Sequence, residues 1–332
     1  MSRRVVITGH GGVTGLGNDW PTIERNILAG RNCVRRMPEW DMFENMNTRL
    51  AAPVADFSVP ESWPRKNTRS MGRVALLSVR ASELALESAG LLGEASIKDG
   101  RMGVAYGSSF GSMEPIRLCG TALQTGSIKG LTSTSYRQAM GHTTPVNIAL
   151  HFELKGRIIP TSSACSSASH AIGYSYEAVR SGRQALMLAG GGEELTPAHA
   201  LIFDTLFATS TRNDTPGVTP SPFDASRDGL VVGEGACTLV LEDLEHARAR
   251  GATILAEIVG YGSNSDGAHA TQPTAATMAA CIRQALQDAG LAPSDIPYVS
   301  AHGTGTDRGD LAESHATHAV FGDRVAISSM KS

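Results

Sequence analysis

Long apolar runs and an excess of either charge are missing from this sequence of 332 residues. No apolar stretch approaches the roughly 20 residues that a membrane-spanning helix needs. The short apolar run from Val5 to Ile7, behind a basic start, cannot serve as a secretory signal. A net charge of −3 gives no basic surface of the kind that binds nucleic acid. We therefore expect a cytoplasmic protein with neither membrane nor nucleic-acid partners.

Clustered cysteines are missing as well. The five cysteines are scattered, odd in number and without C-x-x-C spacing, so the sequence supports neither a disulfide framework nor a zinc site. We expect a reducing compartment and no bound metal. What is present is the composition of a well-packed globular protein, with 41% hydrophobic residues, 18% charged residues and 36 glycines. The length suits one large domain or two modest ones.

Hydrophobic periodicity predicts strands that alternate with helices. Short links join strand, helix and strand around residue 165, which predicts a parallel βαβ unit and an α/β fold. Residues 31–68 are expected to be an irregular surface excursion. The expected strands cover residues 4–8, 102–106, 185–189, 235–242, 254–260, 298–301 and 325–328, and the expected helices cover residues 20–29, 73–90, 146–152, 168–180, 244–250, 275–290 and 310–321.

A glycine-rich segment, residues 10–18, follows the first expected strand and is predicted to be a turn. Glycines here invite a dinucleotide-binding hypothesis, but five residues separate Thr8-Gly9 from Gly15 where short-chain dehydrogenases use three. None of the six tyrosines is followed by lysine four positions later, as that catalysis requires. We therefore favour tight turn packing. The strand before this segment resembles residues 257–262, which hints at a duplicated αβ unit.

Cys165 is the most informative position in the sequence. It lies between an apolar run that ends at Pro160 and a helical pattern that starts at Ala168, with small Ser and Ala residues on both sides. A cysteine at a strand-to-helix junction meets the free N–H groups and the positive dipole end of the helix, which favour thiolate over thiol. The other interpretation of a free cysteine is a small buried apolar side chain. The residues alone leave both interpretations open.

Two further positions invite a functional interpretation. His302 ends an expected strand in the sequence His-Gly-Thr-Gly-Thr, where glycines allow close backbone approach and Thr304 and Thr306 offer hydroxyl groups to a polar ligand. Lys331 follows the last expected strand. Taken singly, such a histidine is more often structural, and such a lysine is a solvated charge. The acidic and histidine residues within 313–318 lack a third convergent ligand, so we expect a polar helix face there and no metal site.

The order of these motifs resembles one family. Cys165 in S-S-A-C-S-S-A, His302 in A-H-G-T-G-T and Lys331 after I-S-S match the β-ketoacyl-acyl carrier protein synthases of the condensing-enzyme, or thiolase-like, superfamily. Further matches run along nearly the whole length. They are V-I-T-G at residues 6–9, G-G-G-E-E-L at 190–195, S-T-R-N-D at 210–214, P-F-D at 222–224, R-D-G at 227–229, G-E-G at 233–235 and E-I-V-G at 257–260.

The resemblance implies a reaction and its catalytic residues. Cys165 would take an acyl group from acyl carrier protein as a thioester, with its own backbone N–H as one oxyanion donor. His302 would polarise the carbonyl of malonyl-acyl carrier protein during decarboxylation, so that the resulting enolate attacks the acyl-enzyme. The implied function is a decarboxylative Claisen condensation that gives 3-oxoacyl-acyl carrier protein in fatty-acid or related polyketide and polyene synthesis.

The resemblance also implies supporting residues. Thr304 and Thr306 would hydrogen-bond the phosphopantetheine arm of the substrate. Lys331, with Glu313 and Asp310, would hold the charge network of the site in place. No cofactor is implied, because acyl carrier protein delivers both the acyl and the malonyl thioester on phosphopantetheine.

A basic cluster and an oligomeric state follow from the same resemblance. The sequence contains a basic cluster, Arg65, Lys66, Arg69 and Arg73, whose simplest interpretation is a solvent-exposed surface without a partner. In the family, basic residues of this region meet the acidic carrier protein, so we predict carrier-protein contact here. The family also implies a homodimer.

The implied fold is thiolase-like α/β, a five-layer αβαβα arrangement of two related αβ halves. We expect residues 1–252 to form the N-terminal half with the nucleophile and residues 253–332 to begin the C-terminal half. The family has a second catalytic histidine in G-H-x-x-G and a Gly-Phe-Gly-Gly loop beyond the position of Lys331. We therefore expect this sequence to be a fragment of a longer chain, and these residues alone to acylate Cys165 without condensing.

Three alternatives stay open. A non-catalytic partner subunit of a ketosynthase heterodimer would lack the nucleophile, so the presence of Cys165 counts against it. An oxidoreductase conflicts with the glycine spacing. An acyltransferase or a degradative thiolase would differ from a synthase in not decarboxylating malonyl-acyl carrier protein.

Overall fold

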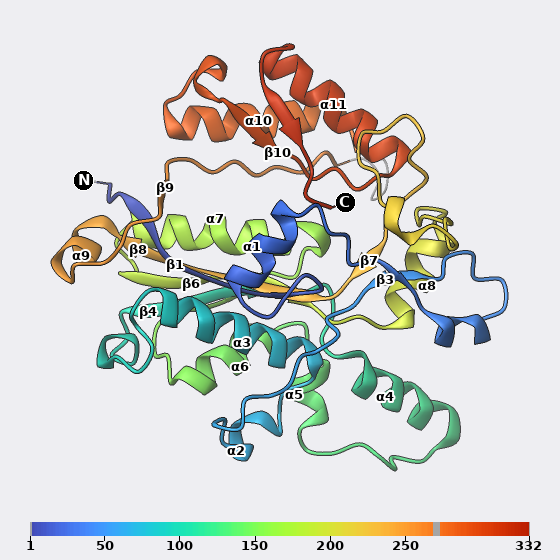
Figure 1. Cartoon of the computed structure of the whole chain (residues 1–332). Helices are drawn as coiled ribbons and strands as arrows, with labels where there is room; N and C mark the ends of the chain where they lie inside the picture. The colour runs from blue at the N-terminus through green and yellow to red at the C-terminus, as the bar shows by residue number, and fades with distance from the viewer. Residues whose placement is uncertain (1, 268–272, 332) are drawn as a thin grey trace. The chain divides into compact units, whose positions relative to one another are not determined.

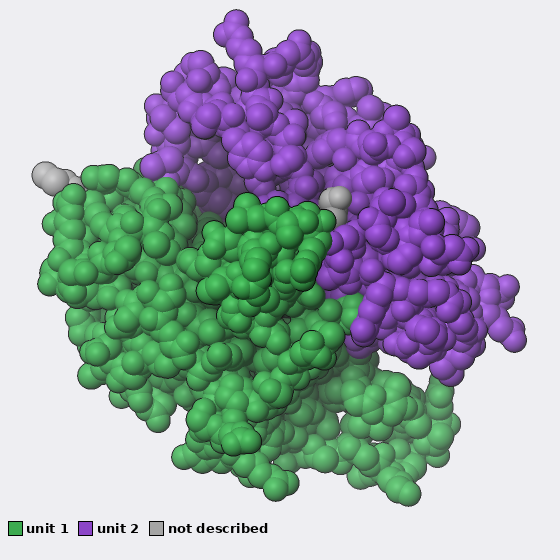
Figure 2. Space-filling model, viewed as in Figure 1, with its two compact units in different colours: residues 1–31, 53–194, 234–258 green, residues 32–52, 195–233, 259–332 purple. Residues whose placement is uncertain are grey.

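A computed structural model describes residues 2–267 and 273–331. The chain divides into two compact units, which Figure 2 shows in different colours. Unit 1 holds residues 1–31, 53–194 and 234–258, and unit 2 holds residues 32–52, 195–233 and 259–332. Each unit therefore combines segments that lie far apart in the sequence. Within the described residues, no helix has the length and apolar character that crossing a membrane requires.

A six-stranded mixed sheet forms the centre of unit 1. In spatial order its strands are β5 (Ile158–Pro160), β4 (Met102–Gly107), β6 (Leu186–Glu193), β8 (Gly235–Asp243), β1 (Val5–Thr14) and β9 (Ala256–Ile258). β4 pairs in parallel with β5 and with β6, which confirms the parallel βαβ unit predicted around residue 165. β8 runs antiparallel to both β6 and β1.

Helices cover both faces of this sheet. The helices of unit 1 are α1 (Trp20–Leu28), α2 (Arg65–Thr68), α3 (Arg73–Ser88), α4 (Met113–Thr125), α5 (Ser135–Ala139), α6 (Thr143–Phe152), α7 (Ser167–Arg180) and α9 (Leu244–Ala249). Figure 1 shows α7 on one face of the sheet, and α3 with α6 on the other. Helical spacing in residues 73–90 predicts apolar positions at Val74, Leu77, Val79, Leu84 and Leu86. All of them are fully buried except Leu84, which is partly buried, so the helical periodicity identified the buried face of α3.

Unit 2 contains two small sheets and three α-helices among the described residues. The sheets are β10 (Tyr298–Ser300) with β11 (Ala326–Ser328), and β2 (Arg35–Arg36) with β3 (Leu50–Ala52) and β7 (Val232–Gly233). The helices are α8 (Pro197–Thr205), α10 (Ala275–Ala289) and α11 (Asp307–Phe321). α10 and α11 lie side by side (Figure 1), and Arg283 on α10 donates to the carbonyl oxygen of Ala319 on α11 over 3.0 Å.

The segment predicted to be an irregular excursion, residues 31–68, is partly ordered. β2, β3 and α2 lie within it, together with a 3₁₀ turn at Pro38–Met42. Trp40 in that turn is 2% exposed and belongs to an apolar cluster with Met37 and with Ala200 of α8. Contacts with a helix distant in the sequence therefore order this segment, and local periodicity does not reveal them.

The glycine-rich turn predicted at residues 10–18 is wrong over its first half, because β1 continues to Thr14, and is confirmed only after that residue, where Thr14 and Gly17 exchange two backbone hydrogen bonds across the turn. The glycines serve close packing against α3 instead. A Cβ at Gly9 would lie 2.5 Å from the carbonyl oxygen of Ala85, and one at Gly11 would lie 2.3 Å from that of Ala81. Real Cβ atoms do not approach backbone oxygens so closely, so only glycine lets the strand and the helix meet here.

Replacing Gly11 with alanine is expected to destabilise unit 1 by about 1–3 kcal/mol, since the new methyl group must displace the backbone of α3. Gly120→Ala on α4 is the matched control, because a Cβ there meets no atom within 4 Å. That change should stabilise the protein by about 0.5–1 kcal/mol through the helix preference for alanine. Urea denaturation of both variants tests the pair; equal effects in the same direction would contradict the packing argument.

The same close contact recurs in unit 2, at the residues that resembled β1 in the sequence. A Cβ at Gly260 would lie 2.5 Å from the carbonyl oxygen of Ala285 on α10, and one at Gly262 would lie 2.4 Å from that of Cys281. In both units, two glycines spaced by two residues thus face two helix carbonyls spaced by four. The hint of a duplicated αβ unit therefore gains a physical basis.

Most other predicted elements are confirmed, with shifted ends. The strand expected at residues 185–189 extends to Glu193, and the helix expected from residue 310 begins at Asp307. α4, α5 and α8 were not predicted. α4 buries Pro115 and leaves Ile116 and Leu123 exposed, so it carries no buried apolar stripe that periodicity could detect.

Candidate active site

Cys165 lies in a short 3₁₀ turn, Ala164–Ser166, between β5 and α7. Its side chain is exposed, so the interpretation as a small buried apolar residue does not apply. Ala164 has a φ of +52°, a left-handed conformation that is energetically costly for a residue with a Cβ. The turn thus presents the thiol on a sharp bend at the N-terminal end of α7, where unpaired N–H groups and the positive end of the helix dipole lie.

Serine side chains hold this bend in place. The backbone N–H of Ser163 donates to Oγ of Ser167 over 2.9 Å, and the Ser167 hydroxyl donates to the carbonyl oxygen of Ala164 over 2.7 Å. The Ser163 hydroxyl also hydrogen-bonds Nδ1 of His170 over 2.8 Å. The small residues that flank Cys165 therefore build the turn as well as leaving space around the sulfur.

Two glycines bring the sheet close to this turn. A Cβ at Gly107, at the end of β4, would lie 2.1 Å from the carbonyl oxygen of Thr161, and one at Gly191 in β6 would lie 2.8 Å from Cβ of Ala168. Because β5, β4 and β6 are parallel, their carboxyl ends share one edge of the sheet. Cys165 follows β5 at that edge, the usual place for a site in an α/β protein.

His302 follows β10 and opens a loop whose backbone the carboxylate of Glu313 holds. Glu313 lies on α11 and accepts the backbone N–H of His302 over 2.8 Å and that of Gly303 over 2.7 Å. Gly303 has a φ of +30°, and a Cβ there would lie 2.7 Å from both the Phe223 ring and Cβ of Ser329. This position therefore requires glycine.

The carboxylate of Asp310 is the second anchor of the loop. The residue is 1% exposed. It accepts the backbone N–H groups of Thr304 over 2.9 Å, Gly305 over 3.2 Å and Phe223 over 2.8 Å. Hydrogen bonds to an ionised acceptor are roughly twice as strong as those between neutral groups. The two carboxylates predicted to support the site thus fix the backbone of the His302 loop.

Thr304 and Thr306 lie beside each other, with their hydroxyl oxygens 2.9 Å apart. Both residues are partly accessible to solvent. A hydroxyl group carries one donor and two acceptor lone pairs, so the bond between the two leaves a donor and acceptors for a ligand. The pair therefore suits a ligand that carries amide groups.

Lys331 reaches His302 from the end of β11. Its Nζ donates to the carbonyl oxygen of His302 and lies 3.5 Å from Nδ1 of the same residue. Desolvation, and then the charge of Lys331, lower the pKa of the His302 imidazole, while Glu313 and Asp310 act in the opposite direction. Part of the residue stays accessible to solvent. At neutral pH the ring is therefore uncharged and offers one N–H donor and one acceptor nitrogen.

Replacing Lys331 with methionine is expected to raise the pKa of His302, because the change removes a positive charge that opposes protonation. An NMR titration of the His302 ring protons should show the midpoint at a higher pH than in the wild-type protein. Lys129→Met removes an exposed lysine of unit 1 and serves as the control. A midpoint that does not move would show that Lys331 has no electrostatic effect on the ring.

The predicted carrier-protein cluster divides into two parts. Arg65 and Lys66 on α2 and Arg69 directly after it are exposed. Arg73 at the start of α3 instead forms an ion pair with Glu234, with Nε and Oε1 2.9 Å apart. The hydrogen bond to Glu234 raises the pKa of the Arg73 guanidinium. Arg73 therefore already has a structural partner within unit 1.

Sequence reasoning did not find a role for Arg227. Its guanidinium donates to the backbone carbonyl oxygens of Thr306 and Asp307, over 3.3 and 3.0 Å. The R-D-G motif marks the residue, but no local pattern connects it with a loop so distant in the sequence. The structure thus gathers every predicted site residue of the His302 loop, together with Lys331 and Arg227, within unit 2, whereas Cys165 belongs to unit 1.

Two adjacent glutamates at the end of β6 were also recognised only as part of a motif. Glu194 is 4% exposed and accepts the backbone N–H of Val74 in α3 over 3.1 Å and that of Met113 in α4 over 2.8 Å. One carboxylate thus caps two helices. Glu193 accepts the N–H of Ser109 over 2.7 Å, and burial raises its pKa to about 7.

Solved structures of similar proteins have the same fold. A crystal structure of a β-ketoacyl synthase from Burkholderia phymatum STM815 matches with a TM-score of 0.98 and 65% identity, over 99% of this chain and 81% of that one. A type II polyketide synthase acyl-carrier protein in complex with its ketosynthase matches with a TM-score of 0.87 and 30% identity, over 100% of this chain and 81% of that one. These matches confirm the predicted class, a thiolase-like α/β enzyme.

Sequence comparisons define the family. The model of the β-ketoacyl synthase N-terminal domain matches residues 2–247, and that of the C-terminal domain matches residues 255–332. The 3-oxoacyl-[acyl-carrier-protein] synthase 1 of Haemophilus influenzae is 35% identical over 333 residues, which cover 99% of this chain and 80% of the relative. The chain therefore belongs to the β-ketoacyl synthase family, as its motifs predict, and is an acyltransferase of the kind that forms carbon–carbon bonds.

Proposed function

We propose that this protein carries an acyl group on Cys165 for condensation with malonyl-acyl carrier protein, in which the residues of this sequence perform the acylation and contribute His302 to the condensation. The observation that carries the proposal is the exposed Cys165 thiol on a strained turn at the start of α7. In the first step, the thiolate attacks the thioester carbonyl of acyl-acyl carrier protein. A bond forms between the Cys165 sulfur and the acyl carbon, the bond to the pantetheine sulfur breaks, and the pantetheine thiolate leaves and takes up a proton.

The second step uses the His302 loop. The neutral His302 ring donates a hydrogen bond to the carbonyl oxygen of the malonyl thioester, which stabilises the enolate left when carbon dioxide departs. The enolate carbon attacks the acyl-enzyme, the carbon–sulfur bond to Cys165 breaks, and the 3-oxoacyl thioester leaves on the carrier protein. Thr304 and Thr306 bind the amide groups of the phosphopantetheine arm, so the substrates need no separate cofactor.

Three residues support this second step without touching the reacting atoms. Glu313 and Asp310 fix the backbone of the His302 loop through the N–H groups described above. Lys331 holds the carbonyl oxygen of His302 and, after desolvation, is the second cause that lowers the pKa of its ring. The proposed division of the sequence, with the nucleophile in residues 1–252 and the histidine in residues 253–332, gives each half one part of the reaction.

A non-catalytic partner subunit remains the alternative function. Such a subunit would not need an exposed nucleophile, and Cys165 argues against it. The experiment that separates the two incubates the protein with acyl-acyl carrier proteins of different chain lengths and measures its mass. Peptide mapping should place a thioester-linked acyl group on Cys165, and the preferred chain length defines the substrate. An adduct on any other residue, or none with any chain length, would overturn the proposed mechanism.

We propose that the acyl carrier protein docks on the exposed part of the basic cluster. Lys66 and Arg69 line a cavity of about 390 Å³ together with Arg137 of α5, which adds a third positive charge. Reversing the charge at Lys66 and Arg69 to glutamate is expected to weaken carrier binding by at least about tenfold at low salt and by less at high salt. Arg324→Glu, at an exposed arginine of unit 2, controls for net charge. Unchanged affinity would exclude this cluster.

We further propose a homodimer. β5 is an end strand of the sheet, and Ile158 within it is 45% exposed. An open strand edge with an exposed apolar side chain is suited to pairing with a second copy. Analytical ultracentrifugation of the protein should show a dimer that the substitution Ile158→Glu weakens. A monomer at all concentrations would contradict the proposal.

A further inference from the structure

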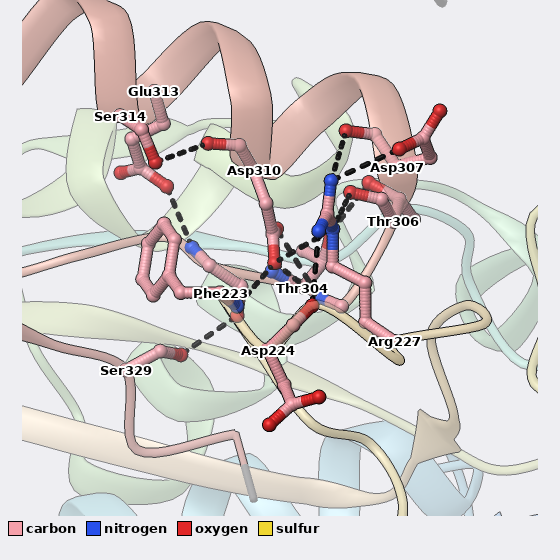
Figure 3. A network of polar contacts seen from close by, with 12 residues as sticks. Phe223, Asp224, Arg227, Thr304, Thr306, Asp307, Asp310, Glu313, Ser314 and Ser329 are labelled. Atoms are coloured by element: carbon pink, nitrogen blue, oxygen red, sulfur yellow. Dashed lines mark hydrogen bonds and ion pairs between the residues drawn. The ribbon is translucent and has the colours of Figure 1, made fainter.

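Arg227 occupies an unusual position at the start of α11. Its Nη2 donates to the carbonyl oxygen of Asp307 over 3.0 Å and to Oδ1 of Asp307 over 2.9 Å, and its Nε donates to the carbonyl oxygen of Thr306 over 3.3 Å. On the side of its own loop, Nη1 donates to the carbonyl oxygen of Asp224 over 2.9 Å. The side chain is 15% exposed. Figure 3 shows the guanidinium between these groups.

Helix stabilisation does not explain this position. A positive charge at a helix N-terminus opposes the helix dipole and costs free energy there. The carboxylates of Asp307 and Asp310 offset that cost, with Oδ2 of Asp310 3.8 Å from Nε. What the guanidinium adds is directional: its fork of N–H groups binds two successive carbonyl oxygens, which a single ammonium group cannot do in the same way.

The carbonyl that Arg227 binds belongs to a residue of the threonine pair. Thr306 is the N-cap residue of α11, and among the described residues its hydroxyl makes no capping bond to that helix. The hydroxyl instead faces Thr304 at 2.9 Å. The Thr306 carbonyl also accepts the backbone N–H of Asp310 over 3.1 Å. Arg227, held against its own segment of residues 224–227, therefore supplies the second hydrogen bond to this carbonyl. Two bonds to the carbonyl fix the orientation of Thr306, and thus the direction in which the hydroxyl pair presents its remaining donor.

We propose that Arg227 is a positioning residue that holds Thr306, and through it the Thr304–Thr306 hydroxyl pair, in the orientation that binds the pantetheine arm. This inference rests on the proposed function of the two threonines. It predicts that Arg227 acts on substrate affinity and leaves the chemical step at Cys165 nearly unchanged. It also predicts that lysine cannot replace arginine, because the bond geometry and not the charge matters.

The test measures single-turnover acylation of the protein by an acyl-pantetheine thioester, of the chain length that labels the wild-type protein best. A free pantetheine thioester isolates the arm from contacts of the carrier protein. Arg227→Lys and Arg227→Gln should raise the half-saturating concentration about five- to tenfold and change the maximal rate less than about twofold. In a Thr306→Val background, Arg227→Lys should add less than about twofold, because the group it orients is gone.

Arg212→Gln is the matched control for loosening of the loop. Nη2 of Arg212 donates to the carbonyl oxygen of Ser226, and its Nε lies 3.5 Å from Oδ1 of Asp228. Arg212 therefore holds the segment on both sides of Arg227 without contacting Thr306. This variant should keep the wild-type half-saturating concentration, and thermal melting should show whether it and Arg227→Lys lose similar stability.

Each outcome decides a separate point. Failure of the wild-type protein to acylate would defeat the proposed function itself. Acylation of the wild-type protein with unchanged half-saturation in Arg227→Lys would overturn the inference alone. The inference would also be overturned if Arg227→Lys raised the half-saturating concentration as much in the Thr306→Val background as in the wild-type background. It would be overturned as well if Arg212→Gln raised that concentration as much as Arg227→Lys, because general loosening of the loop would then explain the effect.

Discussion

Replacing Cys165 with alanine is expected to abolish the acyl-enzyme and to slow cleavage of acyl-acyl carrier protein by at least about 10³-fold, because no other group supplies the attacking electron pair. Cys165→Ser should behave almost identically, since a serine hydroxyl is a weak nucleophile without an activating base. The measurement is the rate of carrier-thiol release, followed together with the protein mass.

Cys119→Ala provides the control for this experiment. Cys119 lies on α4 and is also exposed, so its removal tests whether exposure alone explains acyl transfer. This variant should acylate at the wild-type rate. Retained acylation in Cys165→Ala, or loss of acylation in Cys119→Ala, would show that Cys165 is not the nucleophile.

Replacing Asp310 with alanine is expected to lower the free energy of unfolding by about 3–5 kcal/mol. The substitution leaves the N–H groups of Thr304, Gly305 and Phe223 without their acceptor. An unsatisfied buried group, as at Gly305, costs about 1–3 kcal/mol, the two partly buried groups cost less, and the sum is not fully additive. Because these groups also set the shape of the His302 loop, binding of the pantetheine arm should weaken with stability.

Two further variants serve as comparisons for the loss of unfolding free energy in Asp310→Ala. Asp310→Asn keeps one acceptor oxygen and should fall between alanine and the wild-type protein. Asp323→Asn, at a carboxylate that is 95% exposed and pairs with His318, should change stability by less than about 1 kcal/mol. Urea denaturation compares the three variants. A loss in Asp310→Ala no greater than in Asp323→Asn would show that Asp310 is not an anchor.

The sequence predicts the parts of the site that are written in contiguous residues. The Cys165 turn is such a part, since a strand, small residues and a helix follow one another without interruption. The His302 loop is another, because its glycines and threonines alternate within a few positions. The supporting roles of Glu313 and Asp310 came from a resemblance, and the structure adds the contacts through which both act.

What the sequence does not predict depends on contacts between distant residues. Arg227 and Thr306 are 79 positions apart, and hydrophobic periodicity carries no information on a bond between a guanidinium and a carbonyl. The ordered part of residues 31–68 was not predicted for the same reason: residues of α8, distant in the sequence, bury Trp40. The glycines of β1 led to the wrong prediction of a turn, because glycine has no side chain and so does not show the alternation of apolar and polar residues that identifies a strand. These glycines are required for close packing against α3, which the sequence alone does not show.

The contact of Gly9 and Gly11 with α3 limits which substitutions this sequence tolerates. The atoms that a side chain would strike include backbone oxygens of Ala81 and Ala85, which every amino acid carries. A second substitution in the helix can shrink a side chain but cannot remove a carbonyl group. Compensating pairs of substitutions are therefore excluded at these positions, and in a library of double variants neither glycine should be rescued from within α3.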